Sequence, residues 1–245
     1  MKSKVMYVLL IGILFLSACA FTPPKDGLFK GFHAIVITTD PADKKLYEKL
    51  LPEPFSMPEM PKVKVVVINY TDVVNYWGMS PYLEGYISLL CDYKGEQGWY
   101  PITMPVTKWV PMKLGRRLGY PKYVADEISL TCSDKQCFGK VRHEGLDKMS
   151  LSFTKNLSLD RELTYQEARV SFPIFQLIPP NEGPVVNRIT VEHKIDPSMS
   201  IDAGEVNIKI DPNLPWAGLV SEDAGHTGML IRMQCGFDLS SKRMN

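Results

Sequence analysis

The sequence predicts a mainly β fold, a barrel or a sandwich whose strands pair mostly antiparallel. Three observations favour this class. Short runs rich in β-branched and other apolar residues recur along the chain. Turn residues, mainly Gly and Pro, separate these runs at short intervals. Only one segment has convincing helical spacing of its apolar residues.

The first elements are a strand followed by that helix. His33 to Thr38 is apolar and β-branched, which predicts a buried strand. Asp40 can cap a helix and Pro41 fits its first turn. The apolar residues between 46 and 51 recur on one helical face, and Pro52 ends the helix.

Most of the remaining chain is predicted to be strands within one domain. The expected strands are Val63–Tyr70, Tyr82–Leu90, Ile128–Cys132, Phe138–His143, Leu151–Thr154, Phe172–Ile178, Val185–Val191, Val206–Ile210 and Met229–Cys235. The proline-rich segment from Pro52 to Pro61 is expected to be a connecting loop. We find no internal repeat and no clear domain boundary.

The N-terminus is typical of an export signal. Lys2 and Lys4 precede an apolar run, Val5–Leu16, that is too short for a stable membrane anchor. Residues 16–19, Leu-Ser-Ala-Cys, resemble a bacterial lipobox, in which Cys19 is lipidated. An ordinary signal peptide with a chance cysteine is the alternative. We therefore expect a signal peptide at 1–18, a lipidated tether at 19–29 and one domain at 30–245.

This organisation predicts a protein of the cell envelope, attached to the membrane through its N-terminal lipid. Residue 20, directly after the cysteine, is not Asp. In a cell with two membranes we therefore expect the outer one, with the protein facing the periplasm.

The cysteines indicate a disulfide rather than a metal site. Cys132 and Cys137 flank a polar turn between two strands of an exported chain, where disulfides form readily. Two reduced thiols beside the turn are the alternative. No second Cys/His pair lies at ligand spacing, so zinc is not expected.

Composition and missing motifs exclude several function classes. The formal net charge is +1 and no Lys/Arg run is present, so we expect no nucleic-acid partner. The chain lacks a Gly-rich phosphate loop and a Gly-x-Ser-x-Gly motif. The sequence predicts no cofactor.

Residues 114–122, Leu-Gly-Arg-Arg-Leu-Gly-Tyr-Pro-Lys, carry the strongest chemical signal. Lys122 follows a proline in a glycine-punctuated turn, just behind Arg116 and Arg117. Burial and nearby positive charge both favour the neutral amine that a nucleophilic lysine needs. A solvated lysine after a turn proline is the alternative.

The order of several segments resembles the acetoacetate decarboxylase family over roughly residues 30 to 240. The matching segments are Thr38-Thr39-Asp40, Leu51-Pro52-Glu53-Pro54-Phe55, Tyr82-Leu83-Glu84, Leu114-Gly115-Arg116, Gly119-Tyr120-Pro121-Lys122, Leu177-Ile178-Pro179 and Gly204-Glu205-Val206-Asn207-Ile208-Lys209.

The resemblance implies a closed, cone-like antiparallel β-barrel that assembles into oligomers. It also implies that Lys122 forms a Schiff base, that Glu84 is the carboxylate of the cavity and that Arg116 is its cation. Residues Arg117, Tyr120 and Tyr123 would then be candidates for substrate binding.

The chain departs from the family pattern near this lysine. Tyr123 stands where the family usually has a second lysine, and Arg117 stands where it has a glutamate. The stretch between Arg116 and Pro121 is one residue shorter than usual, so an ungapped alignment places Tyr123 at the nucleophile position. Lys30 replaces an N-terminal arginine of some members.

Three functions therefore remain open from the sequence. In the first, Lys122 forms an imine with a small oxo acid, as in a decarboxylating lyase. In the second, the barrel binds a small acid or a lipid-like ligand without turnover. In the third, the chain is a structural envelope lipoprotein with an unused cavity.

Overall fold

The computed structural model describes residues 27–75, 77–156, 173–183, 185–223 and 225–244. The predicted signal peptide, Cys19 and the first part of the predicted tether lie outside these residues. Neither helix of the described chain has the length and apolar character needed to cross a bilayer.

The described chain contains eleven strands and two helices. The strands are β1 Phe29–Thr39, β2 Val63–Val73, β3 Tyr82–Tyr93, β4 Glu96–Val106, β5 Lys122–Val124, β6 Glu127–Cys132, β7 Gln136–His143, β8 Leu146–Lys155, β9 Ile174–Ile178, β10 Val185–Ile210 and β11 His226–Met244. The helices are α2 Lys44–Leu50 and α3 Trp109–Leu118.

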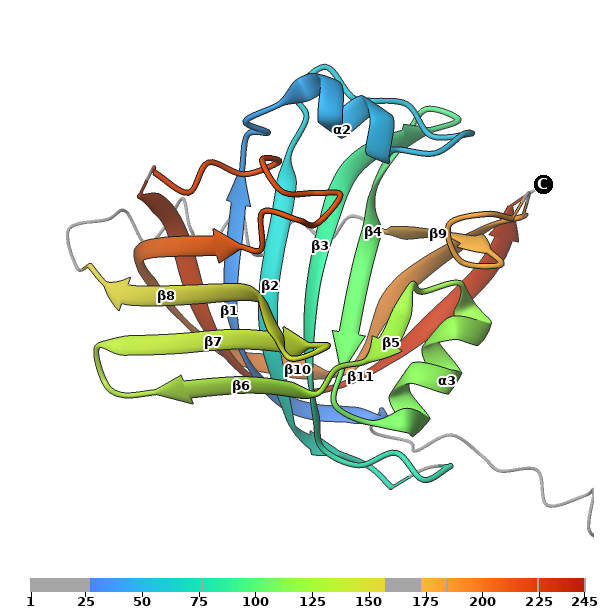
Figure 1. Ribbon diagram of the computed structural model, residues 1–245. Helices are drawn as coiled ribbons and strands as arrows, with labels where there is room; N and C mark the ends of the chain where they lie inside the picture. The colour runs from blue at the N-terminus through green and yellow to red at the C-terminus, as the bar shows by residue number, and fades with distance from the viewer. Residues whose placement is uncertain (1–26, 76, 157–172, 184, 224, 245) are drawn as a thin grey trace, which may run out of the picture.

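Seven of the strands close into a barrel (Figure 1). Their order is β11-β1-β2-β3-β4-β9-β10, and pairing between β10 and β11 completes the ring. All of these pairs are antiparallel except β4 with β9, which meet in parallel register at Trp99 and Ile174. The predicted closed antiparallel barrel is therefore confirmed.

A second layer packs across one wall of the barrel. Strands β8, β7 and β6 continue the sheet from the C-terminal half of β10 and run across the front of β1, β2 and β3 in Figure 1. The second layer approaches the barrel wall closely at Gly139, which has no side chain to hold the two apart. A Cβ on Gly139 of β7 would lie 2.9 Å from Val67 Cβ of β2. The main apolar core fills the space between these layers, with Phe153 and Leu151 of β8 fully buried in it.

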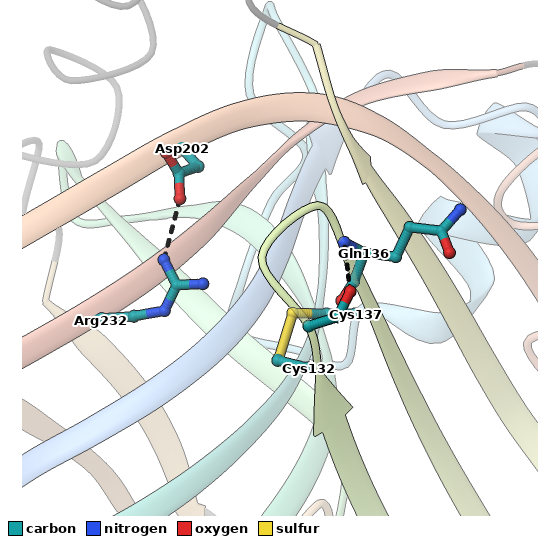
Figure 2. The surroundings of a disulfide bond; sticks show 6 residues. Cys132, Gln136, Cys137, Asp202 and Arg232 are labelled. Carbon is teal, nitrogen blue, oxygen red and sulfur yellow. Dashed lines mark hydrogen bonds and ion pairs between the residues drawn. A yellow bond between two sulfur atoms is a disulfide. The ribbon is translucent and has the colours of Figure 1, made fainter.

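A disulfide closes the hairpin of β6 and β7 (Figure 2). It joins Cys132 and Cys137, the pairing that the polar turn between them predicted. Nearby, Arg232 of β11 donates a hydrogen bond of 2.9 Å to Asp202 of β10. The disulfide fixes the end of the β6–β7 hairpin, and the ion pair links β10 to β11.

The structure differs from the sequence prediction in four elements. Helix α2 is capped by Asp43, whose carboxylate accepts from the backbone N–H of Lys45 and Leu46, whereas Asp40 pairs with Lys62. Strand β4 was not predicted, because its two prolines and its glycine weaken the strand pattern. Residues 185–191 and 206–210, predicted as separate strands, belong to the single strand β10.

The fourth difference matters most for the site. Residues 109–118 form helix α3, so Arg116 and Arg117 lie in a helix rather than in a turn. Pro111 lies in the first turn, where it is tolerated, but Gly115 in the middle lowers the intrinsic helix propensity. Tertiary packing therefore stabilises a helix that the local sequence does not favour.

Candidate functional site

The end of α3 sets the position of Lys122. Gly119 has φ 99°, a left-handed conformation that glycine adopts without steric cost. Its N–H donates to the carbonyl of Arg116, and the Tyr120 N–H donates to the carbonyl of Gly115, both at 3.1 Å. The chain then reverses and enters β5, where Lys122 pairs in parallel register with Met104 of β4.

Gly115 leaves space for the lysine side chain. A Cβ at this position would lie 2.5 Å from Lys122 Cδ and 2.8 Å from its Cε. Because such distances are too short for real contacts, any larger residue would displace the lysine stem. The helical glycine that weakens the propensity of α3 is thus required by tertiary packing against Lys122.

Lys122 and Glu84 form a buried ion pair. Lys122 Nζ lies 2.5 Å from Glu84 Oε2, and the two residues are 7% and 3% exposed. Glu84 lies in β3, between Ile68 of β2 and Val106 of β4 in the sheet register. Two sequence-predicted residues, 38 positions apart in the chain, therefore meet at one site.

Tyrosines surround this pair. Lys122 Nζ lies 5.6 Å from the Tyr82 ring centroid and 5.4 Å from that of Tyr120, within the range of cation–π attraction. Burial, followed by the charge of Glu84, raises the pKa of both Tyr82 and Tyr120. Both phenols therefore stay protonated at physiological pH and act as neutral groups.

The two arginines do not join this cluster. Arg116 and Arg117 are exposed on α3, whereas the neighbouring Gly115 faces Lys122. Arg116 donates a hydrogen bond of 3.0 Å from Nη1 to the backbone carbonyl of Lys122. The expectation that Arg116 supplies the cavity cation is therefore wrong for this conformation, because the helix turns its side chain outward. Arg117 likewise lies away from the buried pair.

Tyr123 occupies the opposite face of β5. Its ring lies 4.7 Å from that of His143, and it lines an apolar hollow with Pro105, Val141 and Trp216. Successive strand residues point to opposite faces, so Tyr123 and Lys122 cannot share one compartment here. Lys122, and not Tyr123, is the residue that meets Glu84.

The barrel interior contains a further polar residue that the sequence did not single out. Gln176 of β9 is 0% exposed, and neither its amide nitrogen nor its amide oxygen has a hydrogen-bond partner among the described residues. It shares a face of β9 with Ile174, which packs against Tyr120 and Met104. A lone Gln in an otherwise apolar strand segment, residues 174–178, is the signal that could have identified it.

Lys64 is another polar residue that faces the barrel interior. It precedes the apolar part of β2, and its Nζ lies 3.9 Å from the centroid of the Trp99 ring. The sequence interpretation treated residues 63–70 as a buried strand and did not single out its lysine. In the described part of the chain, no group of three or more His, Cys, Asp and Glu residues is placed to hold a metal ion.

Comparison with known proteins places this site in context. The sequence model of the acetoacetate decarboxylase family matches residues 18–219. No curated protein sequence matches the chain. The fold is similar to acetoacetate decarboxylase from Legionella pneumophila, with TM-score 0.70 and 20% identity over 90% of this chain and 87% of that one.

Two further solved structures share the fold. One is the enduracididine biosynthesis enzyme MppR in complex with pyruvate, with TM-score 0.67 and 17% identity over 91% of this chain and 92% of that one. The other is an acetoacetate decarboxylase-like enzyme from Sphingomonas wittichii, with TM-score 0.60 and 20% identity over 90% and 94% of the two chains.

Removal of either partner of the buried pair is expected to destabilise the protein. Lys122→Met leaves the Glu84 carboxylate buried without a counter-ion, which costs about 3–5 kcal/mol in comparable cases. The double variant Glu84→Gln/Lys122→Met removes both charges and should recover most of that loss. Urea denaturation of both variants measures the difference, and equal losses would show that the pair is not coupled.

Proposed function

The chain belongs to the acetoacetate decarboxylase family, and we propose that its barrel binds a small carboxylic acid without turning it over. The observation that carries the proposal is Gln176, a fully buried amide whose donor and acceptor lack partners among the described residues. Such a group costs about 1–3 kcal/mol unless something pairs with it. A ligand carboxylate or carbonyl inside the barrel would supply that partner.

The surroundings of Lys122 argue against turnover. Imine formation requires a neutral amine, whereas a carboxylate in contact favours the charged ammonium. In the acetoacetate decarboxylase family, a cationic neighbour activates the nucleophilic lysine by favouring its neutral form. Here both arginines nearest in sequence are exposed, and Lys122 Nζ instead contacts Glu84 at 2.5 Å. Lys122 therefore faces a carboxylate in the position where an activated lysine has a cationic neighbour.

The class of ligand follows from the groups available inside the barrel. The Lys122 ammonium and the protonated tyrosines are hydrogen-bond donors, which suit a carboxylate or an oxo group. MppR, which shares the fold, has been solved with pyruvate. A small oxo acid is therefore the first ligand to test, followed by acids with larger apolar bodies.

Gln176→Leu is expected to have opposite effects on stability and on binding. Replacing an unpaired buried amide by an apolar side chain should raise the free energy of unfolding by about 1–3 kcal/mol. The same change should weaken the best-binding acid from a panel of pyruvate, acetoacetate and octanoate. Calorimetry for binding and urea denaturation for stability measure the two effects.

Asn187→Leu is the matched control for this experiment. Asn187 lies opposite Gln176 in the sheet register. Unlike Gln176, it has a partner among the described residues, because its amide nitrogen donates a hydrogen bond of 2.8 Å to the backbone carbonyl of Leu118. Its loss should therefore destabilise the protein by about 1 kcal/mol. If Gln176→Leu destabilises the protein as Asn187→Leu does, the amide is not an unsatisfied group awaiting a ligand. If no acid in the panel binds, the proposed function is wrong.

Imine chemistry at Lys122 is the second candidate, and the burial of this amine inside the barrel favours it. Glu84 could take the ammonium proton, after which the neutral amine attacks the carbonyl carbon of an oxo acid. Glu84 could then return the proton as the carbinolamine oxygen leaves as water, giving an iminium that accepts electrons when CO2 departs.

Reduction with borohydride separates the two candidates. We expect no covalent mass on Lys122 when the protein is incubated with pyruvate or acetoacetate and then reduced, because the amine stays paired with Glu84. Intact-mass and peptide-mass spectrometry provide the readout, with Lys122→Arg as the control. A substrate-dependent mass increase that disappears in this variant would replace the binding proposal with the imine mechanism.

We also propose that the protein is exported and attached to the cell envelope by a lipid on Cys19. The sequence Leu16-Ser17-Ala18-Cys19 after an apolar run supports this location. An N-terminal lipid would leave the barrel in the aqueous phase beside the membrane. We further propose that the protein assembles into a homo-oligomer, as the family resemblance implies.

Metabolic labelling with an alkyne-bearing fatty acid tests the attachment. We expect the full-length protein to incorporate the label and to fractionate with membranes, because acyl chains bury in the bilayer. Cys19→Ser should lose both properties, whereas Cys91→Ser, which alters a buried cysteine of the domain, should keep the label. Labelling of the Cys19→Ser protein would contradict the assignment.

A further inference from the structure

Three side chains with hydrogen-bond donors form a row across β1, β2 and β3. In the sheet register, Lys64 lies opposite Thr38 on one side and Ser88 on the other. Directly opposed residues of antiparallel strands point to the same face of the sheet. The amine and the two hydroxyls of this Thr38–Lys64–Ser88 row therefore lie side by side.

The row faces the barrel interior. Val66, two residues after Lys64, packs in a cluster with Val36 of β1 and Met229 and Ile231 of β11, which are neighbouring strands of the barrel. Because side chains alternate along a strand, Lys64 points to the same side as Val66. Ser88 is 1% exposed, while Thr38 and Lys64 are half-buried. The row is thus recessed but not fully covered.

The row has no partner within the described part of the chain. No carboxylate there pairs with Lys64, and neither hydroxyl of the row forms a hydrogen bond with a described residue. The neighbouring Lys62, by contrast, pairs with Asp40 at 2.7 Å. A partly buried cation without a counter-ion is disfavoured, so an anion placed on the Thr38–Lys64–Ser88 row would be stabilised there.

The groups around Lys64 leave its charge uncompensated. The Nζ atom of Lys64 lies 3.9 Å from the centroid of the Trp99 ring of β4. Tyr86 of β3 lies two residues before Ser88 and pairs with Val66 of β2. Burial raises the pKa of Tyr86, so this phenol stays neutral. Burial alone lowers the pKa of Lys64 to about 7. Without a bound anion, the Lys64 side chain therefore changes between its charged and neutral forms near neutral pH.

We propose that the Thr38–Lys64–Ser88 row binds the carboxylate of an amphipathic acid, whose apolar body extends along Val66 toward the Lys122–Glu84 pair. The inference rests on the proposed ligand-binding function and deepens it. Lys64 would supply the positive charge, Thr38 and Ser88 would donate hydrogen bonds, and Trp99 would cover the amine.

The distance between the Thr38–Lys64–Ser88 row and the Lys122–Glu84 pair indicates the length of the ligand. Lys64 lies opposite Ser88, and Glu84 lies four residues before Ser88 on the same face of β3. Four residues of a strand span about 13 Å. Between the ends lie Val66 and Tyr86, paired in the same register. An acid with an extended alkyl or aryl body therefore fits this face better than a compact acid such as pyruvate.

Calorimetric titration of the purified full-length protein with octanoate tests the proposal, with octanamide as the uncharged probe. Octanoate should bind at least tenfold more tightly than octanamide at pH 6. Because the bound carboxylate favours the ammonium of Lys64, affinity should change by no more than about twofold between pH 6 and pH 7. Above pH 7 it should fall about tenfold for each pH unit, with proton uptake on binding.

Variants of Lys64 separate a binding role from a structural one. Lys64→Arg should keep octanoate binding but lose the dependence on pH, because arginine stays charged. Lys64→Met should weaken octanoate by at least about tenfold and leave octanamide unchanged. Lys62→Met, on the same strand, is the control and should change neither affinity.

Three results would overturn the inference. If octanoate binds wild-type protein and Lys64→Met equally, or without dependence on pH, the row is not the carboxylate site, and the proposed binding function stands. If octanoate and octanamide bind equally, recognition is apolar and the row plays no part. If neither octanoate nor the oxo acids bind, both the inference and the proposed function are wrong.

Discussion

The buried ion pair between Lys122 and Glu84 is the constraint on which the rest of the site depends. Two charges taken out of water are tolerated only when their geometry is good and their surroundings are polar enough. Here β3 supplies the carboxylate, β5 supplies the amine, and Tyr82 and Tyr120 surround them. Because an unpaired partner would be strongly destabilising, the pair fixes the short strand β5 to the barrel wall.

The neighbouring elements follow from this requirement. Helix α3 can approach β5 closely only because Gly115 leaves room for the lysine stem. Gly119 ends the helix in a left-handed conformation, and the chain then turns so that Lys122 enters the interior. The same helix directs Arg116 outward, where it binds the carbonyl of Lys122. The arginine thereby stabilises the backbone of the site without entering it.

Besides Gln176, the barrel interior carries charged groups at two separated places with apolar residues between them. One is the Lys122–Glu84 pair, which is internally neutralised, and the other is the Thr38–Lys64–Ser88 row, which is not. This asymmetry favours an amphipathic anion bound at the row over a compact substrate reacting at Lys122. A fold shared with decarboxylases thus remains compatible with a binding role, since function depends on the site rather than on the fold.

The sequence alone predicted the fold class and the pairing of Cys132 with Cys137 across a hairpin, and it singled out Lys122 and Glu84, which the structure brings into contact. These follow from β-branched periodicity, turn composition and a family resemblance in the order of short motifs. The sequence failed at β4 and α3, since Pro101, Pro105 and Gly115 oppose local propensity and only packing against the barrel compensates for them.

Only the tertiary structure decided which groups share the interior. Lys122 and Tyr123 are neighbours in β5, yet Lys122 faces the interior and Tyr123 the other side of the strand. Gly115 and Arg116 are neighbours in α3, yet Gly115 faces Lys122 and Arg116 is exposed. The lone Gln176 in an apolar segment is a local signal, but only the fold shows that it is buried without a partner among the described residues, and that Lys64 lies beside Trp99 without a carboxylate there. The physical reason is that a side chain's charge and reactivity depend on neighbours distant in sequence, and these neighbours are fixed only when the barrel closes.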